Sequence, residues 1–282
     1  MFELKVKNHR GEMLTLTNNP NYTVYKIEGL SPPQSTVNSS VNTTSDGSVI
    51  NAVRLNSRNI VIYVAMEGNV ETNRINLYKY FPVKKTITLY YANCTRDVCI
   101  SGVVEIIECD FFTNKQVAQI SILCPKPYFK AVEDNSSSFS DISSLFEFPF
   151  AISAEGVEIS AITHNIRKSI VNVGDTDTGA IINLFATGEV VNPIIYDVLK
   201  RTKMALNFTM QTSDNIIINT NFGEKSIKLI RNGITTDIMG YLSKDSNWIT
   251  LEAGDNLFTY DCESGNSSLD ITFTTSVLYA GV

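Results

Sequence analysis

The sequence lacks the features by which most enzymes are recognised. It has only two histidines and one tryptophan in 282 residues. Neither His9 nor His164 stands in a motif with Ser, Cys or a carboxylate that would suggest a catalytic triad. No H-E-x-x-H, G-x-S-x-G or phosphate-binding loop is present. These absences predict that the chain is not an enzyme, has no catalytic or cofactor-binding residues, and carries no cofactor.

Cysteine is sparse and poorly spaced for metal binding. Of the five cysteines, only Cys94 and Cys99 are close together, as a single C-x₄-C pair with no second pair and no nearby histidine. Zinc sites need four such ligands, and a reducing cytoplasm disfavours disulfides. We therefore expect free thiols, most of them buried, and no metal site.

The chain also lacks long apolar runs and clusters of positive charge. Its start, MFELKVKNHRGEM, has no apolar core of a secretion signal, and no run approaches the roughly 18 apolar residues of a membrane span. Residues 1–132 carry 14 Lys+Arg against 10 Asp+Glu, whereas residues 133–282 carry 9 against 19. The basic residues are scattered and the acidic half would repel phosphates, which argues against nucleic-acid recognition. We expect synthesis in the cytoplasm and no membrane insertion.

Two acidic pairs could be mistaken for functional sites. Asp175 and Asp177 form a D-x-D-x-G segment that lacks the other ligands of a calcium loop, so a turn between strands is favoured. Glu155 and Glu158 could be imagined as the two catalytic carboxylates of a glycosidase. That chemistry requires a defined distance between the two carboxyl groups, which the sequence alone does not give. Neither pair is assigned a role.

What is present is the pattern of a β protein. Ile, Val, Thr, Tyr and Phe are abundant, and short alternating segments recur along the chain. The shift in charge near residue 130 predicts two domains, 1–132 and 133–282. Expected strands in the first half are 2–7, 13–17, 24–30, 49–55, 60–65, 86–91, 100–107 and 119–123. Those in the second half are 161–163, 169–173, 180–186, 216–220, 226–230, 248–251, 257–260 and 269–273.

One helix is expected in the first half, over residues 72–81. Thr72 is its expected cap and Pro82 its stop. Ile75, Tyr78 and Phe81 are expected to form its buried stripe, which Leu77 and Tyr80 widen. In the second half, Asn192-Pro193 before IIYDVLKRT fits either a helix or a strand after a turn; we favour the strand.

A polar segment in the first half predicts an arm. Residues 34–48 are rich in Ser, Thr and Asn and follow Ser31-Pro32-Pro33, which cannot continue a β ladder. Within Val24–Asp46 we therefore expect an arm that reaches a neighbouring protomer.

Several motifs in order resemble one family. They are YKIEGLSPP (25–33), LYKYFPVKKTITLYY (77–91), ISILCPKPYF (120–129), the hairpin INTNFGEKSIKL (218–229), SNWITLEAGDNLFTY (246–260) and a final Tyr-x-Gly. In this order the chain resembles the distal tail proteins of long-tailed phages that infect Gram-positive bacteria. The resemblance covers nearly the whole sequence.

The resemblance implies a mainly β fold of two domains. These are an N-terminal β-sandwich with one helix, 1–132, and a C-terminal galectin-like β-sandwich, 133–282. It also implies a structural role in the virion, with the N-terminal domains forming a hexameric ring at the distal end of the tail. The implied partners are the tail tube protein, the tail-associated lysin or tail tip protein, and receptor-binding proteins.

A rival interpretation is a carbohydrate-binding module that contacts the host cell wall. Galectin-type sugar sites use a Trp platform with His, Asn and Arg around it. The sole Trp, Trp248, lies in an alternating segment where core packing is at least as good an explanation, and no matching His/Arg motif accompanies it.

Overall fold

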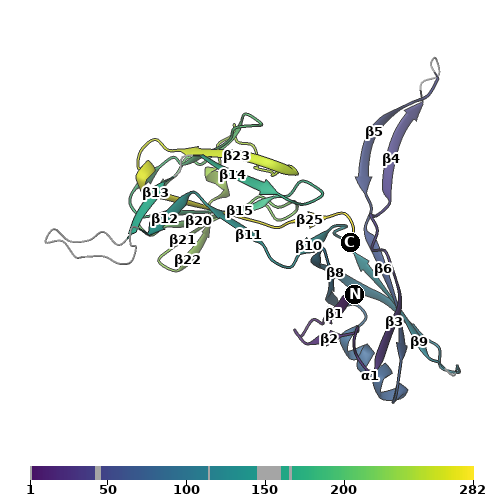
Figure 1. Cartoon of the computed structure of the whole chain (residues 1–282). Helices are drawn as coiled ribbons and strands as arrows, with labels where there is room; N and C mark the ends of the chain where they lie inside the picture. The colour runs from purple at the N-terminus through teal and green to yellow at the C-terminus, as the bar shows by residue number, and fades with distance from the viewer. Residues whose placement is uncertain (1, 42–45, 114, 145–159, 165–166) are drawn as a thin grey trace. The chain divides into compact units, whose positions relative to one another are not determined.

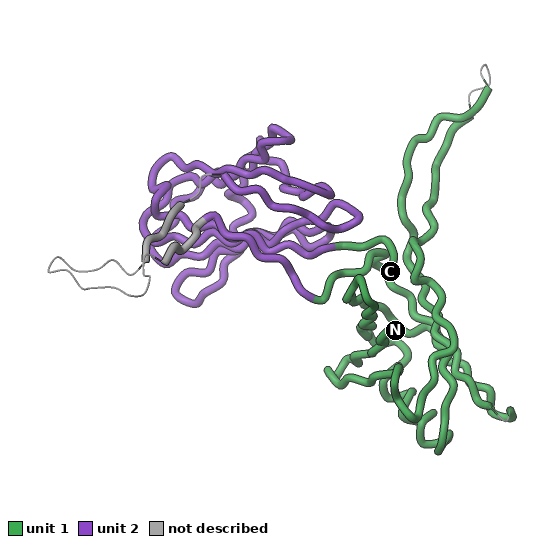
Figure 2. Tube along the Cα trace, in the orientation of Figure 1, with its two compact units in different colours: residues 1–132, 278–282 green, residues 133–277 purple. Residues whose placement is uncertain are grey.

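The computed structural model describes residues 2–41, 46–113, 115–144, 160–164 and 167–282. The chain divides into two compact units (Figure 2). Unit 1 comprises residues 1–132 together with 278–282, and unit 2 comprises residues 133–277.

Unit 1 is built on a nine-stranded sheet (Figure 1). Seven strands follow the order β2-β1-β7-β8-β9-β6-β3, while β10 pairs with both β8 and β25. Their bounds are β1 (Glu3–Lys7), β2 (Met13–Thr15), β3 (Tyr22–Glu28), β6 (Arg58–Met66), β7 (Thr86–Ala92), β8 (Asp97–Cys109), β9 (Val117–Cys124), β10 (Phe129–Ala131) and β25 (Leu278–Tyr279).

Strand β6 is paired on both sides, but it lies next to the edge strand β3 and not at the centre of the sheet. It lies between β3 and β9 in antiparallel register. Ile60, Ile62 and Val64 are fully buried, while Val61 and Tyr63 on the opposite face are half-buried. The alternation has period 2, so one face of β6 supplies the core and the other lines the outer side of the sheet.

The one α-helix of the described residues, α1 (Val70–Tyr80), closes the core of unit 1. Its cap is Asn69, whose side chain accepts from the Thr72 amide, so the expected Thr72 cap was wrong. The expected stripe was wrong for Ile75 and Tyr78, which are 63% and 40% exposed, whereas Leu77 and Phe81 are fully buried as expected. On the buried side of the helix, the Tyr22 hydroxyl of β3 donates to the Asn73 carbonyl.

The polar segment expected to form an arm contains one strand of a β ribbon. Strand β4 (Ser35–Val41) pairs antiparallel with β5 (Ser48–Leu55) as a separate two-stranded sheet. Figure 1 shows the two strands projecting together from the rest of unit 1. The Ser/Thr/Asn composition misled because β4 needs no buried face: all of its residues are exposed.

Unit 2 contains a six-stranded sheet of order β11-β24-β15-β20-β21-β22 and a four-stranded sheet of order β14-β23-β17-β18. Two small pairs, β12 with β13 and β16 with β19, complete it. The bounds are β11 (Asn135–Ser138), β12 (Ser140–Ser144), β13 (Ser160–His164), β14 (Arg167–Asn172), β15 (Ala180–Ala186), β16 (Val190–Val191), β17 (Ile194–Asp197), β18 (Thr202–Ala205), β19 (Thr209–Met210), β20 (Asn215–Asn219), β21 (Ser226–Arg231), β22 (Ile234–Asp237), η1 (Met239–Tyr241), β23 (Gly254–Asp261), η2 (Asn266–Ser268) and β24 (Leu269–Thr275).

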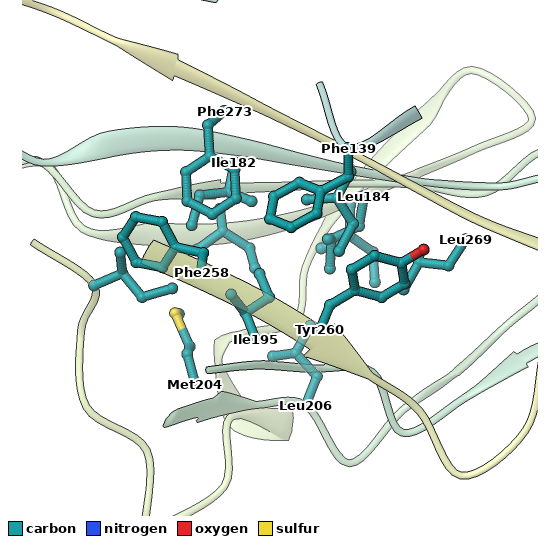
Figure 3. Close-up of a cluster of buried hydrophobic side chains, with 14 of the residues drawn as sticks. Phe139, Ile182, Leu184, Ile195, Met204, Leu206, Phe258, Tyr260, Leu269 and Phe273 are labelled. Carbon is teal, nitrogen blue, oxygen red and sulfur yellow. The ribbon is translucent and has the colours of Figure 1, made fainter. Parts of the chain in front are cut away.

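The core of unit 2 lies between its two larger sheets (Figure 3). Phe273 of the six-stranded sheet stacks on Phe258 of the four-stranded sheet, with ring centroids 5.0 Å apart. Phe139 meets Tyr260 edge to face at 5.4 Å. Side chains from both inner faces thus interdigitate, as in a β-sandwich.

Three expectations for the second half can be compared with these strands. The segment after Asn192-Pro193 is the strand β17 followed by a turn, as favoured. The expected strand 248–251 was wrong: Leu251 makes only an isolated bridge to Thr178, and β23 pairs with β14 and β17 instead. Residues 146–150, Glu155 and Glu158 lie outside the described residues.

The last five residues return to unit 1, although the expected second domain ran to residue 282. β25 pairs with β10, and the Val282 amide donates to the Leu30 carbonyl. The sequence had left open where the final strand packs.

The mainly β class with one helix is confirmed. In unit 1 the expected sandwich is a single hydrogen-bonded sheet, and α1 covers part of its core. Unit 2 has the two facing sheets of a sandwich.

Candidate interaction surface

The β4–β5 ribbon exposes apolar side chains that nothing in the described chain covers. Val37 is 51% exposed, Val41 75% and Ile50 62%, and Val49 and Val53 are similarly open. A two-stranded ribbon with no core of its own is marginally stable in water. Exposed apolar groups gathered on one element are typical of a binding surface.

The base of the ribbon is held by one buried cation, Arg58. This side chain, 2% exposed, follows β5 and opens β6. Its Nη1 donates to the carbonyls of Gly29 (2.5 Å) and Ser31 (2.7 Å), just before β4. Its guanidinium stacks 4.5 Å from the centre of the Phe129 ring. Both ends of the ribbon are thereby tied to one group.

The same guanidinium reaches two more distant segments. Arg58 Nε donates to the Pro127 carbonyl (2.8 Å), and Nη2 donates to the Ala280 carbonyl (2.5 Å). Burial lowers the pKa of Arg58, but arginine pKa values are so high that the group stays charged. Four carbonyl oxygens replace the water that a buried cation loses.

Gly29 allows this close packing. It has φ of +84°, and an added Cβ would lie 2.1 Å from the Asn59 carbonyl oxygen. Two further hydrogen bonds close the ribbon: the Asn56 amide donates to the Gln34 carbonyl, and Thr36 Oγ1 donates to Asn56 Oδ1 at 2.8 Å. The ribbon therefore leaves a rigid base.

Sequence reasoning assigned no role to Arg58. It is a lone cation beside Asn56-Ser57, where a turn residue is expected. One feature of the sequence could have revealed this role. Arg58 opens a strand that is apolar on both faces, and a charged residue buried there needs hydrogen-bond partners inside the protein.

The acidic pair Asp175 and Asp177 lies in a turn organised by Asn172. Asn172 Oδ1 accepts from the Gly174 amide and its Nδ2 donates to the Thr176 carbonyl. Within the described ranges no three His, Cys, Asp or Glu side chains gather as a metal site would require. The turn interpretation of this segment agrees with the structure.

The histidines and cysteines are not brought together. His9 is exposed in the turn between β1 and β2; His164 belongs to β13, and its side chain is outside the described part. No two of the five cysteines form a disulfide, but only Cys124 and Cys262 are buried, whereas Cys94 is exposed. Burial raises the pKa of the Cys124 thiol to about 11.

Trp248, the candidate sugar platform, is partly buried against the core of unit 2. The Nζ atom of Lys225 lies 5.1 Å from the centre of its ring. A stacking sugar would have to displace this ammonium group.

Within the described ranges, no helix has both the length and the apolar character that a membrane crossing requires.

Residues 173–276 match the family model described as "Siphovirus-type tail component, C-terminal domain". Unit 2 carries this tail-component domain. The match ends one residue short of Val277, where unit 2 ends. The matched family is a structural one and not a family of enzymes.

Solved structures share the fold of the whole chain. The Dit protein (gp 19.1) of phage SPP1, described as a hub of the adsorption apparatus of phages infecting Gram-positive bacteria, matches with a TM-score of 0.70. The alignment covers 99% of each chain at 11% identity. A chain of the phage P2 baseplate in its activated conformation with Ca matches at 11% identity, covering 98% of each chain, with a TM-score of 0.51. The form with Sr matches at 12% identity, covering 97% of this chain and 98% of that one, with a TM-score of 0.54.

No curated protein matches the chain. The predicted resemblance to the distal tail proteins is confirmed by the domain match together with the shared fold.

Proposed function

We propose that the protein is a structural hub at the distal end of a phage tail. The observation that carries this proposal is the tail-component match over residues 173–276, set within a fold shared with the SPP1 hub protein over 99% of both chains. In this proposal the protein is a virion component, made in the host cytoplasm, that works by assembly and not by turnover.

The hub would be a homohexameric ring formed by unit 1, joining the tail tube protein to the tail-associated lysin or tail tip protein. The exposed apolar residues of the ribbon support a contact between copies, because a heterologous contact that closes by rotation gives a ring. Unit 2 would then be the galectin-like domain, facing outwards as an anchor for receptor-binding proteins. Its excess of acidic over basic residues would help to keep assembled rings from associating with one another.

Light scattering and negative-stain electron microscopy on the same purified fraction test this proposal. We expect a mass six times that of the chain and rings with a central channel. A monomer that also fails to form rings when mixed with tail tube protein would contradict the hexameric hub.

Carbohydrate binding by unit 2 is the alternative, and Lys225 over Trp248 does not favour it. A glycan array with the intact protein separates the two, since a hub without a sugar site would give no specific signal.

A further inference from the structure

Unit 1 has a surface pocket at the end of the sheet where β8 and β9 are joined. The cavity measures about 550 Å³ and is lined by three aromatic rings, Tyr63, Tyr78 and Phe111, and by two carboxylates, Glu108 and Asp110. The sheet register aligns Glu108 with Gln119, and Gln119 with Tyr63, so these three side chains share the outer face of the sheet. We call this cavity the acidic pocket.

The two carboxylates of the acidic pocket have no ion pair within the described residues, although cations lie nearby. Lys26, 5.8 Å from the Tyr63 ring, is bonded to Glu28 at 2.6 Å. Arg74, 4.5 Å from the Phe111 ring, is paired with Glu71. Because each of these cations has its own acidic partner, Glu108 and Asp110 leave the pocket with negative charge. Carboxylates bind a guanidinium group through charged hydrogen bonds, and the Tyr78 ring beside them has no cation over it among the described residues.

The ribbon carries the complementary group. Arg54 is the one cation among its described residues, it is exposed, and no hydrogen bond or ion pair engages its side chain there. Beside it, Val53 pairs across the ribbon with Val37, and both are more than half exposed. A cation on an apolar ribbon and an acidic pocket with aromatic walls are complementary in charge and in polarity.

Arg54 and the acidic pocket of one copy lie at opposite ends of β6. The ribbon joins β6 at Arg58, whereas Ala65, near the other end, pairs with Val117 of the pocket wall. Seven residues of strand separate the two points, or about 23 Å. Arg54 therefore does not reach the pocket of its own copy and can enter only that of another molecule. A projection at one end and a receiver at the other are what a head-to-tail ring requires.

We propose that the ribbon of one copy docks on the next copy with Arg54 in the acidic pocket, between Glu108 and Asp110. This inference rests on the proposed ring and names its receiving surface. The valines of the ribbon cover the aromatic wall, and the guanidinium neutralises both carboxylates.

Charge reversal tests the contact. Arg54→Glu, and separately Glu108→Lys with Asp110→Lys, should each raise the protein concentration needed for rings on the order of ten-fold or more, because like charges then meet. Lys85→Glu, at an exposed lysine that has no side-chain partner among the described residues, is the matched control and should assemble as the parent does.

The two reversed proteins should assemble when mixed in equal amounts. In a ring in which the two proteins alternate, the Glu at position 54 of one protein meets the two lysines in the pocket of the other. The native Arg54 of that other protein meets the native carboxylates of the first. Rings from the mixture but from neither protein alone would support the docking. Rings that survive Arg54→Glu at the parent's concentrations would overturn it and leave the hub proposal standing.

A second measurement applies if the parent forms no rings by itself. Arg54→Lys places an amine at that position, which a zero-length carbodiimide couples to a carboxylate in contact. Mixing isotope-labelled and unlabelled protein identifies cross-links between copies by mass spectrometry. Mixed-isotope links from position 54 to Glu108 or Asp110 would support the docking even without stable rings. Links from position 54 only to other carboxylates, or none, would overturn it.

Discussion

Arg58 Nη2 and the carbonyl oxygen of Ala280 are 2.5 Å apart in space and 222 residues apart in sequence. The contact joins the start of β6 to the returning end of the chain. Arg96 adds a second tie, since its guanidinium lies 4.2 Å from the Tyr279 ring and bonds to the Gly281 carbonyl. Unit 1 is thus completed only after the chain has passed through unit 2.

Replacing Arg58 by Met should destabilise unit 1 by about 3 kcal/mol, because four buried carbonyls lose their donor. Amide hydrogen exchange should rise first in residues 278–282 and at the base of the ribbon. Arg10→Met, at an exposed turn residue, is the control. Unchanged exchange in the returning segment would contradict the role of Arg58 as its anchor.

Shortening the ribbon should abolish assembly and leave the fold intact. Replacing residues 36–54 by Asn-Gly would remove Arg54 and the exposed valines and join Ser35 to Leu55, which already face each other across the ribbon. The described ribbon residues contribute nothing to the buried core of unit 1, so thermal unfolding should shift little. Light scattering should report a monomer. Rings from the shortened protein would rule out the ribbon as an assembly element.

Local pattern accounts for much of the fold. Apolar residues on both faces predicted β6, and alternation predicted β24, in which one face packs in a core. Such patterns did not predict β4. This strand pairs with β5 and has no buried face, so its sequence shows no alternation of apolar and polar residues. The helical pattern failed for part of α1: Ile75 is exposed, while the polar Asn73 is buried with its side chain donating to the Glu67 carbonyl. The Arg58 anchor joins Gly29, Pro127 and Ala280, and no local pattern links such distant positions.

Gly29→Ala and Gly11→Ala form a matched pair. Their φ angles are +84° and +85°, but an added Cβ at Gly29 would meet the Asn59 carbonyl oxygen at 2.1 Å, whereas at Gly11 its nearest neighbour is 3.9 Å away. The φ strain alone costs about 1 kcal/mol. Gly11→Ala should lose about that much stability, and Gly29→Ala should lose several times more or fail to fold. Calorimetric melting of both proteins checks this, and equal losses would show that the close approach is relieved elsewhere.

Thiol reactivity should rank the cysteines by exposure. Cys94 is exposed, while Cys124 is buried with a pKa near 11 and is almost wholly protonated at pH 8. An aromatic disulfide reagent should label Cys94 first, and Cys94→Ser should remove the fast phase. Cys124 should react only after denaturation. Rapid labelling of Cys124 in the native protein would mean that β9 opens readily.

Asp214 makes the stability of unit 2 dependent on pH. The Arg231 side chain donates from Nε to Asp214 Oδ1 (2.7 Å) and from Nη2 to Oδ2 (2.5 Å), and the Gln211 amide donates to Oδ2 (2.7 Å). Asp214 is 1% exposed. The hydrogen bonds from Arg231, followed by the one from the Gln211 amide, outweigh burial and lower the pKa of Asp214.

A lowered folded-state pKa means that Asp214 stabilises unit 2 fully above its unfolded pKa of about 3.9, and that this contribution is lost as the pH falls through the folded value. Asp214→Asn should cost about 2–4 kcal/mol at pH 7, since it leaves Arg231 unpaired. The gap between wild type and variant should narrow below pH 4.

Denaturant unfolding followed by fluorescence measures this in unit 2 alone, because the one tryptophan, Trp248, lies there. Asp245→Asn, at an exposed carboxylate, should leave the unfolding free energy within about 0.5 kcal/mol of wild type at every pH. A gap between wild type and Asp214→Asn that stays constant from pH 7 to pH 2 would mean that the ionised carboxylate is not what holds Arg231. The hydrogen bond to the Gln211 amide, which a neutral amide oxygen can also accept, would then be the contact that fixes this turn.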